Sequence, residues 1–586
     1  MHRIAMPKLE LSGAGEEVAE GLFGANILAH RNSLDEAVNY DELVDDVRVH
    51  TLRYPGGSVT EDYFDFANPD REVVFDRETG EQSDFIQISE FMQFAEDEDL
   101  SAVLVLNTRD QLSDETDANG DRYADIDEEG LRQFVNDAVT GKWGDVDIAG
   151  FEIGNEYWGS GRMSATEYGR VASEMATIID DELRSLEGDY AQAADTEVIV
   201  QMGTNFNHSS LDEDYEGMSH AEILDAVNDR YDLDLEELPS NGFTGINNEI
   251  IMSHFDTPEE VDAMDAVVGH VYSKVGDDTG DWQRSYMLDA IDETWGQDPR
   301  FADKETYVSE WNQHSNTGAH EDHEDYGLKN SHELLNMIEE FADHGVDEAQ
   351  VWPLLQNSSA SLSLGREYQE LTPTGKMYAM MSENLPGKSV LDMRGDGEMA
   401  DNASFPDMDV HGFYGDGEAV FYLASNSDQA ISQEVDVSGL LKDAGTLEIT
   451  VLGVEEGQNP GDQASTPTVR QLDPEEVYNE GYISADLEPY EIMQVKVSDF
   501  EPTEAMQAAM DEIDGAGQGD EGGDTPPEDE EAEDSENPEP DPPAEEDPEN
   551  QDEDEDSEEE GGFMAGLEGL GLAAALLPLL VLMGAA

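Results

Sequence analysis

Residues 151–160 read FEIGNEYWGS, and this stretch decides both the fold and the site that the sequence predicts. A short apolar run typical of a buried strand leads directly into a glycine, the pair Asn155-Glu156 and two aromatic residues. A strand that only has to end is more usually followed by Gly, Pro, Asp or Ser. An amide and a carboxylate at this point therefore indicate a strand end that carries chemistry.

The apolar run at 147–156 is one of eight in residues 1–375. Most of them are rich in Val, Ile and Leu without alternation, which is typical of parallel strands covered on both faces. Amphipathic stretches between them, such as 83–99, 165–186 and 331–345, have apolar residues at helical spacing. Eight strand–helix units in about 350 residues predict a (β/α)8 TIM barrel with long loops, with a doubly wound open sheet as the alternative. The eight runs are 21–28, 50–57, 101–108, 147–156, 197–205, 266–273, 305–312 and 348–357.

The rest of the chain changes in character twice. Residues 376–500 contain short strand-like runs separated by Gly, Asn, Asp and Ser, which predicts a small all-β sandwich domain. Residues 501–560 hold 29 acidic and no basic residues, and predict an acidic disordered linker. Residues 561–586 are hydrophobic, with 18 uncharged residues after Glu568. That length is near the lower limit for crossing a bilayer, so a C-terminal membrane anchor or sorting tail is predicted, with an export signal or docking segment as the alternative.

The charge of the chain excludes some partners. The sequence has 141 acidic and 27 basic residues, a formal net charge of −114, and 111 of the acids lie in residues 1–500. Such a body repels nucleic acid and anionic membranes at low salt, so nucleic acid is not a predicted partner. Because the acids are spread over the chain, we favour a halophilic-type protein, in whose medium the repulsion is screened. Wide use of Ca²⁺ is the alternative.

Location is constrained less directly. The absence of cysteine excludes disulfides, thiolate zinc sites and a cysteine nucleophile. The N-terminal residues contain no apolar core of an ordinary signal peptide. The C-terminal segment nevertheless favours an extracellular or cell-surface location, reached by another export route.

One acidic loop deserves a test as a metal site. The stretch DANGDRYADIDEE (117–129) has oxygen side chains at alternating positions, a spacing at which Ca²⁺ can be bound. Gly120 and the lack of a glutamate twelve positions from a start break the EF-hand pattern, so calcium stays an open alternative and no metal or cofactor is predicted. The positions concerned are Asp117, Asn119, Asp121, Asp125 and Asp127.

Two carboxylates end predicted strands four and seven. Glu156 follows the fourth apolar run, and Glu310 ends the seventh, ETYVSEWN. Barrel enzymes place their chemistry at the carboxyl ends of strands, where closure of the barrel brings these positions to one pocket. Two facing carboxylates can cleave an acetal, since one donates a proton to the leaving oxygen and the other attacks the anomeric carbon or activates water. A lone acid at a strand end is usually only solvated, but this pair, flanked by Trp and Asn, favours catalysis.

These strand ends resemble those of the retaining glycoside hydrolases of clan A, in particular the arabinofuranosidases of family 51, the xylosidases of family 39 and the heparanase-like glucuronidases of family 79. The resemblance covers residues 20 to about 375 and extends to the sandwich. It implies that Glu156 is the general acid/base, Glu310 the nucleophile and Asn155 a hydrogen-bond partner of the sugar 2-hydroxyl. The two carboxylates should then lie about 5–5.5 Å apart.

Other strand ends agree with this resemblance. LRYPGGS (52–58) is similar to the strand-two motif, which implies that Arg53 approaches the nucleophile and that Gly56-Gly57 allow the backbone near the sugar; an ordinary tight turn is the alternative. HVY (270–272) is similar to the His-x-Tyr of strand six. It implies that Tyr272 donates to Glu310 and that His270 contacts substrate or a carboxylate.

Aromatic and amide side chains complete the candidates. Trp352 on strand eight is a platform on which a sugar face could stack, or a packing residue. Asn107 and Asn205, at the ends of strands three and five, are weaker candidates for binding substrate. Trp158 and Trp311 are candidates of the same rank, with packing as the alternative.

The predicted function is hydrolysis of O-glycosidic bonds in oligo- or polysaccharides by double displacement. The sugar stays open among arabinosides, xylosides and glucuronides, and a uronic acid would need a basic group other than Arg53 in the pocket. The alternative function is a surface-displayed, non-catalytic carbohydrate-binding protein on the same barrel. A lyase or aldolase would usually require a lysine or a metal cluster at strand ends, and the motifs contain neither.

Overall fold

The computed structural model describes residues 8–274, 282–315, 320–394, 403–405 and 407–516. The predicted linker beyond residue 516 and the hydrophobic segment 561–586 lie outside the described residues. Within the part that is described, no helix combines the length and the apolar character needed to cross a membrane.

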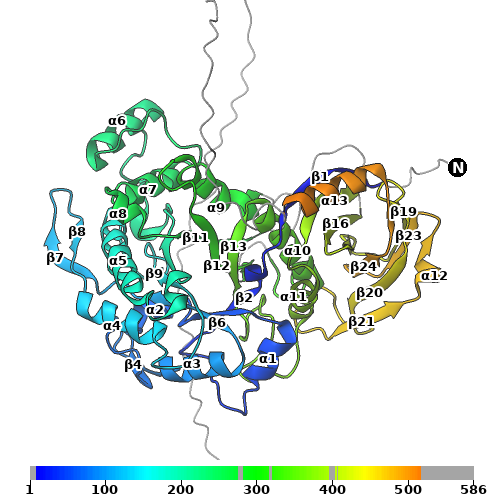
Figure 1. The fold of residues 1–586 in the computed structure, drawn as a ribbon, viewed down its shortest axis with the longest axis horizontal. Coiled ribbons are helices and arrows are strands. Elements are labelled where there is room, and N and C mark those ends of the chain that lie inside the picture. Colours follow the sequence, from blue (N-terminus) through cyan, green and yellow to red (C-terminus); the bar gives the residue numbers. More distant parts are fainter. Residues whose placement is uncertain (1–7, 275–281, 316–319, 395–402, 406, 517–586) are drawn as a thin grey trace, which may run out of the picture. The chain divides into compact units, whose positions relative to one another are not determined.

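Eight parallel strands close into a barrel, each paired with its neighbours in the order β2-β3-β6-β9-β10-β11-β12-β13 (Figure 1). Each of the eight predicted runs overlaps one of these strands, although β12 ends one residue later and β13 begins two residues earlier than predicted, so the barrel prediction is confirmed and the open sheet is wrong. The strands are β2 (Gly24–Asn26), β3 (Thr51–Tyr54), β6 (Ser101–Leu106), β9 (Ile148–Ile153), β10 (Glu197–Gln201), β11 (Ala266–Ser273), β12 (Glu305–Gln313) and β13 (Val346–Val351).

Helices surround the barrel (Figure 1). The longest, α5 (Ala165–Leu186), has the predicted bounds because a capping box between Ser164 and Glu167 starts it. The others are α1 (Tyr40–Val47), α2 (Val59–Asp62), α3 (Ile88–Asp97), α4 (Glu128–Val139), α6 (His220–Tyr231), α7 (Phe243–Met252), α8 (Pro258–Val261), α9 (Trp282–Asp292), α10 (Leu328–Asp343) and α11 (Pro373–Asn384).

Short elements occupy the loops between barrel strands. Two antiparallel hairpins pair β4 (Val73–Phe75) with β5 (Gln82–Asp84) and β7 (Leu112–Thr116) with β8 (Arg122–Ala124). Single 3-10 turns lie at Glu20–Phe23, Ala191–Ala194, Asn207–Ser209 and Trp295–Gln297.

The interior of the barrel is filled by side chains rather than open. One cluster inside it is apolar and consists of Val103, Ile199, Ala266, Val268 and Tyr307. Toward the carboxyl ends of the strands, the interior is filled by buried polar side chains, including Arg53, Glu152 and Asn155. An apolar layer therefore supports a polar one at the carboxyl ends of the strands.

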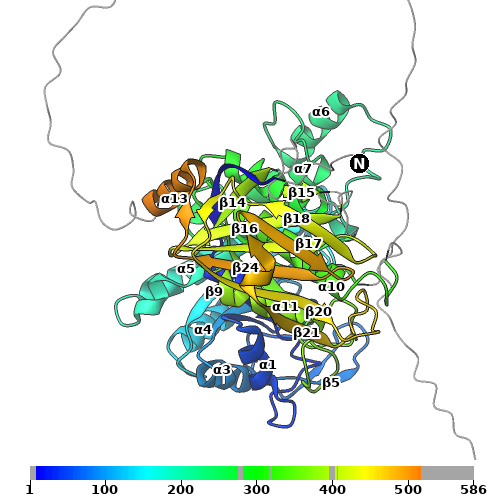
Figure 2. The same cartoon turned by 90° about the vertical axis from the view of Figure 1, so that its right-hand side faces the viewer.

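The predicted β-sandwich is also present (Figure 2). Its larger sheet has the order β1-β14-β16-β17-β24-β20-β21, with β15 on β16, and the smaller one is β18-β23-β22. The strands are β1 (Glu10–Glu17), β14 (Ser389–Arg394), β15 (Ala403–Phe405), β16 (Met408–Gly415), β17 (Glu418–Ser425), β18 (Ile431–Asp436), β19 (Leu441–Asp443), β20 (Thr446–Val454), β21 (Pro467–Leu472), β22 (Tyr478–Asn479), β23 (Tyr482–Leu487), β24 (Ile492–Ser498) and β25 (Glu501–Pro502), and the helices are α12 (Pro474–Val477) and α13 (Glu504–Ala516).

The boundaries of the two domains differ from the predicted ones at both ends. β1 pairs antiparallel with β14, so residues 10–17 belong to the sandwich and not to the predicted barrel domain 1–375. α11 belongs to the barrel, since the Tyr378 hydroxyl donates to the Gly24 carbonyl at 2.8 Å. The barrel therefore extends beyond residue 375, to the end of this helix.

The first residues of the predicted acidic linker are folded. Residues 501–516 fold as β25 and α13, and Met506 and Ala509 are buried against the sandwich core, with Met510 and Ile513 packed beside them. The prediction of disorder from residue 501 is wrong because these four side chains recur at helical spacing and form an apolar stripe within an acidic sequence.

Candidate active site

Arg53, at the carboxyl end of β3, is fully buried and links four strand ends. Its Nε and Nη2 donate to the two oxygens of Glu152 at 2.6 and 2.8 Å. Nη1 donates to Glu310 Oε1 at 3.1 Å and to Asn26 Oδ1 at 2.9 Å, and Nη2 donates also to Asn155 Oδ1 at 2.8 Å. Burial alone would lower the pKa of Arg53, but Glu152 and Glu310 raise it above its ordinary value. The guanidinium is therefore a fixed cation that orients Glu310 and Asn155.

Glu152 is a functional candidate that the sequence reasoning missed. It lies within β9 with no exposed surface, and accepts hydrogen bonds from Gln201 Nε2 and Ser309 Oγ, both at 3.1 Å, besides those from Arg53. A buried carboxylate is costly unless it is paired and hydrogen-bonded. The signal was a charged residue inside an otherwise apolar strand, because such a residue needs a partner.

Glu310, on β12, is held from two sides. Arg53 donates to Oε1, and the Tyr272 hydroxyl donates to Oε2 at 2.9 Å. Burial and the nearby Glu310 raise the pKa of Tyr272 well above its ordinary value, so the phenol stays protonated and remains a donor. The contacts that the motifs predicted for Arg53 and Tyr272 are both present, and the Glu310 side chain is 7% exposed.

Glu156 follows β9 and is more open than Glu310, with 34% of its side chain exposed. Its backbone has φ of 43°, a turn conformation that follows directly from the strand end. His270 Nδ1 lies 3.5 Å from Glu156 Oε1 and 3.8 Å from Glu310 Oε2. The two carboxylates therefore face one imidazole nitrogen. These two distances limit the separation of the two carboxylate oxygens from above, and that limit includes both the retaining spacing of about 5–5.5 Å and the lower part of the inverting range.

His270 is buried between the two acids. Burial alone would lower the pKa of His270, but Glu310 and Glu156 raise it above its ordinary value. Its other ring nitrogen, Nε2, lies 3.2 Å from Ser309 Oγ, and the Trp158 ring packs against the imidazole with its centroid 6.1 Å away. The two acids therefore favour the protonated form of His270.

A second buried acid that the sequence reasoning missed fixes the Asn155-Glu156 turn. Glu61, in α2, accepts from the backbone N–H groups of Thr108 at 3.1 Å, Arg109 at 2.8 Å and Asn155 at 3.2 Å. Burial raises the pKa of Glu61, and these hydrogen bonds act against that rise. The loop after β3 therefore positions the tip of β9.

The glycine pair after β3 packs against protein. A Cβ at Gly56 would lie 2.2 Å from the Ile27 carbonyl oxygen, and one at Gly57 would lie 2.6 Å from the Trp352 ring. Both glycines also have positive φ, of 83° and 59°. The resemblance implied an approach to the sugar, whereas these contacts explain the glycines by a turn against Ile27 and Trp352. Trp352 itself is half-buried and retains exposed surface.

The weaker candidates lie in different settings. Asn107 accepts from Phe66 N at 3.4 Å and donates to Asp110 at 3.5 Å, so its amide bonds to neighbouring loops. Asn205 donates to Asp212 at 3.2 Å. Trp311 is fully buried, with its ring 5.3 Å from that of Phe341, which makes it a core residue.

The acidic loop at 117–129 is the turn of the β7–β8 hairpin and the start of α4. Asp117 Oδ1 accepts from three backbone N–H groups of the turn, and its Oδ2 pairs with Arg170 at 2.6 Å. Asp121 accepts from Ser164 at 2.7 Å, and Asp127 caps α4. Among the described residues, no group of three or more His, Cys, Asp or Glu is placed to hold a metal ion.

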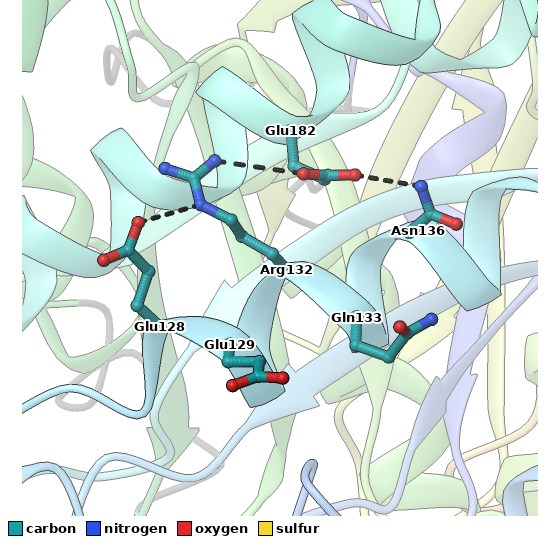
Figure 3. Close-up of a pocket in the computed structure, with 6 residues that line it drawn as sticks. All are labelled: Glu128, Glu129, Arg132, Gln133, Asn136 and Glu182. Atoms are coloured by element: carbon teal, nitrogen blue, oxygen red, sulfur yellow. Dashed lines mark hydrogen bonds and ion pairs between the residues drawn. The ribbon is translucent and has the colours of Figure 1, made fainter.

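An open hollow of about 520 Å³ lies on the outer helical layer, between α4 and α5 (Figure 3). Its polar side chains bond to one another: Arg132 pairs with Glu128 at 3.0 Å, and Asn136 donates to Glu182 at 2.9 Å. None of the strand-end residues described above lines it. This hollow is therefore separate from the candidate active site.

Comparison with known proteins supports the assignment of the fold. The GH51 arabinofuranosidase from Xanthomonas axonopodis pv. citri superposes with a TM-score of 0.56 and 14% identity, over 84% of this chain and 100% of that one. The fold is that of clan A glycoside hydrolases. An α-L-arabinofuranosidase from Thermotoga maritima, solved with arabinose, has a TM-score of 0.56 at 13% identity, over 84% and 99% of the two chains.

A bifunctional glucanase-xylanase from a metagenome library is also similar, with a TM-score of 0.52 at 12% identity, over 84% of this chain and 99% of that one. No family model and no curated protein matches the sequence. At such low identity the likeness concerns the fold, and the predicted resemblance to clan A is confirmed at that level.

Proposed function

We propose that this protein is a retaining glycoside hydrolase, with Glu310 as nucleophile and Glu156 as general acid/base. The observation that carries the proposal is that one imidazole nitrogen, of His270, lies within ion-pair distance of both carboxylates. Fold likeness to glycoside hydrolases supports the same reading at a coarser level.

In the first step, a carboxylate oxygen of Glu310 attacks the anomeric carbon. The bond from that carbon to the leaving oxygen breaks, and this oxygen takes the proton of Glu156. Arg53 and Tyr272 hold Glu310 in place for the attack, because each donates to one of its oxygens. The product is a glycosyl ester of Glu310 and the released alcohol.

In the second step, Glu156 acts as a base and removes a proton from water, which attacks the anomeric carbon from the side that the alcohol left. The ester bond breaks and Glu310 is restored. The greater exposure of Glu156 suits this role, since the leaving group and the water must reach it from solvent. Two inversions give net retention of configuration.

The proposal is tested by hydrolysis of aryl arabinofuranoside, xyloside, glucoside, galactoside and glucuronide in molar salt. We expect one glycoside to be cleaved by the wild type and not by Glu310→Ala. Azide should restore the reaction of this variant and give the glycosyl azide of inverted configuration. A first product of inverted configuration from the wild type would contradict double displacement.

A folded protein that hydrolyses neither these glycosides nor any polysaccharide would reject the enzyme. Polysaccharide binding that persists in Glu310→Gln, with no hydrolysis by the wild type, would instead favour the non-catalytic carbohydrate-binding protein.

A further inference from the structure

The hydroxyl of Ser309, on β12, contacts two side chains of the candidate active site. Ser309 Oγ donates to Glu152 Oε1 at 3.1 Å and lies 3.2 Å from His270 Nε2. Only 1% of the residue is exposed, so both contacts are made inside the protein. The two proposed reaction steps use neither contact, and the sequence motifs assigned no role to Ser309.

The Ser309 proton points to Glu152. A serine hydroxyl has one proton and donates one hydrogen bond, whereas a carboxylate only accepts. Glu152 Oε1 also accepts from Arg53 Nη2 at 2.8 Å and from Gln201 Nε2 at 3.1 Å. If Ser309 donated to His270 instead, lone pairs of two oxygens would face each other at 3.1 Å in a buried place.

The proton of the contact between Ser309 and His270 must then come from the imidazole. Ser309 Oγ has given its proton to Glu152 and offers only lone pairs to His270 Nε2. A deprotonated Nε2 would face those lone pairs at 3.2 Å, whereas an N–H group makes a hydrogen bond there. The partner of one ring nitrogen determines which tautomer is present. Both contacts of Ser309 are therefore satisfied only when His270 carries a proton on Nε2.

The other ring nitrogen of His270 faces the two proposed catalytic acids. Nδ1 lies 3.5 Å from Glu156 Oε1 and 3.8 Å from Glu310 Oε2. Glu310 already accepts from Arg53 on Oε1 and from the Tyr272 hydroxyl on Oε2. Glu156 is the nearer acid, and catalytic hydrogen bonds are often long before the substrate binds. Nδ1 is thus placed to exchange a proton with Glu156.

The surrounding charges support a proton on Nδ1 as well. Burial and Arg53 lower the pKa of His270, whereas Glu310 and Glu156 raise it above its ordinary value. Tyr272, on the same strand, adds no charge, because its raised pKa keeps the phenol protonated. In the imidazolium form, the proton on each ring nitrogen faces an oxygen acceptor.

We propose that Ser309 is a positioning residue that keeps the Nε2 proton of His270 in place, so that only Nδ1 exchanges a proton with Glu156. This inference rests on the proposed glycosidase and deepens it, because it states how the general acid receives its proton.

The proton moves between three atoms during the reaction. In the free enzyme it lies on Nδ1 of His270, opposite the Glu156 carboxylate. A substrate that displaces water favours the neutral pair, since desolvation disfavours charged forms. Nδ1 then gives the proton to Glu156, which passes it to the leaving oxygen. In the second step Glu156 removes a proton from water and returns it to Nδ1, so the enzyme ends in the state in which it began.

Nuclear magnetic resonance of the imidazole nitrogens tests the tautomer without reference to activity. The chain has 13 histidines, and the signals of His270 in protein labelled with nitrogen-15 histidine are those lost in His270→Gln. Above the pH at which His270 becomes neutral, we expect the wild type to keep the proton on Nε2. A neutral His270 with its proton on Nδ1 in the wild type would overturn the proposal.

Ser309→Ala removes the acceptor of the Nε2 proton. We expect the titration midpoint of His270 to fall, because the imidazolium loses a hydrogen bond. We also expect kcat to fall roughly tenfold, the effect of about one hydrogen bond, with KM within about threefold. The matched control is Ser331→Ala, since Ser331 is buried on α10 and its Oγ donates to the Gly327 carbonyl at 2.9 Å. This control should lower stability and leave both kcat and the His270 titration unchanged.

The outcomes separate this inference from the proposed function. If Ser309→Ala matches Ser331→Ala in kcat and in the His270 titration, the role of Ser309 is overturned and the glycosidase stays intact. A lower His270 midpoint with unchanged kcat overturns proton exchange through Nδ1. If the wild type hydrolyses no glycoside, the titration still decides whether Ser309 holds the Nε2 proton: a lower midpoint in Ser309→Ala supports it, and an equal midpoint overturns it.

Discussion

Glu152 and Arg53 form a two-point ion pair inside the barrel, with both donor–acceptor distances below 3 Å and neither side chain exposed. The same guanidinium also binds Glu310 and Asn155. Glu152 is too deep to touch a sugar in this arrangement, because Arg53 separates it from Glu310. We therefore infer that Glu152 is a positioning residue that determines where Arg53 holds Glu310.

Glu152→Gln should therefore impair turnover more than binding. The amide keeps the shape but presents an N–H to Arg53 in place of an oxygen and removes the compensating charge. We expect kcat to fall by roughly a hundredfold, the cost of a small misplacement of reacting groups, with KM within about threefold. Breaking a buried pair should also cost about 3 kcal/mol of stability.

A matched control separates positioning from stability. Glu167 receives a similar two-point contact from Arg122, at 2.7 and 2.8 Å, outside the barrel. Glu167→Gln should lower the midpoint of urea unfolding and leave kcat unchanged. Equal kcat in wild type and folded Glu152→Gln would show that Arg53 is positioned without Glu152.

Sequence reasoning found what local patterns encode. Parallel strands covered on both faces are continuous apolar runs, which is why all eight barrel strands could be predicted, and Glu156 and Glu310 stand out because each directly follows such a run. Glu152 has no local signature of its role, since its partner Arg53 is 99 residues away. β1 was missed for the same reason: ELSGAGEE has little apolar pattern, and its partner β14 is distant in the sequence, at Ser389–Arg394.

The hydroxyl of Tyr272 is predicted to affect turnover through its hydrogen bond to Glu310 and to contribute little to stability. Tyr272→Phe removes one charge-assisted hydrogen bond and retains the ring, so we expect kcat to fall roughly ten- to a hundredfold with little change in unfolding. Tyr378→Phe removes a similarly buried hydroxyl that donates to Gly24, and should cost stability without changing kcat. A Tyr272→Phe enzyme with unaltered kcat would remove Tyr272 from the mechanism.

His270 should stabilise the fold in a pH window set by its two acids. Its pKa is raised in the folded protein above the unfolded value of about 6.5. The stabilisation is therefore complete below pH ~6.5 and is lost as the pH rises through the folded pKa. The difference in unfolding free energy between wild type and His270→Gln should be larger at pH 5.5 than at pH 9.

A second histidine, His254, should show the opposite pH dependence of stability and is a control for that experiment. Burial lowers the pKa of His254 to about 4. Its contribution to the unfolding free energy is therefore present above pH ~6.5 and is lost as the pH falls from ~6.5 toward 4. The difference in unfolding free energy between the wild type and His254→Gln should thus grow from pH 5 to pH 7. Parallel pH trends for both variants would point to a general effect of pH and contradict the assignment for His270.

His344 caps the carboxyl end of α10, close to acids from two helices. Its Nδ1 lies 2.7 Å from Asp292 and its Nε2 lies 3.3 Å from Glu340. Burial alone would lower the pKa of His344, but these hydrogen bonds and charges raise it to about 10. We expect His344→Gln to cost about 2 kcal/mol at pH 6, and this cost should disappear between pH ~6.5 and about 10. A cost that is independent of pH would mean that the charge of His344 is not involved.

The acidic body should be stabilised by salt through screening rather than by calcium. Residues 1–500 hold 111 acids against all 27 bases, so repulsion among them opposes the folded state at low ionic strength. We expect Tm to rise by ~5 °C or more, the effect of about 2 kcal/mol in a large domain, between 0.2 M and 2 M KCl with EDTA present. If millimolar CaCl2 in 0.2 M KCl gives the same rise in Tm, and EDTA abolishes it, specific calcium sites would be supported instead. Asp117→Asn would then be the first substitution to measure, because oxygen side chains alternate along the 117–129 loop.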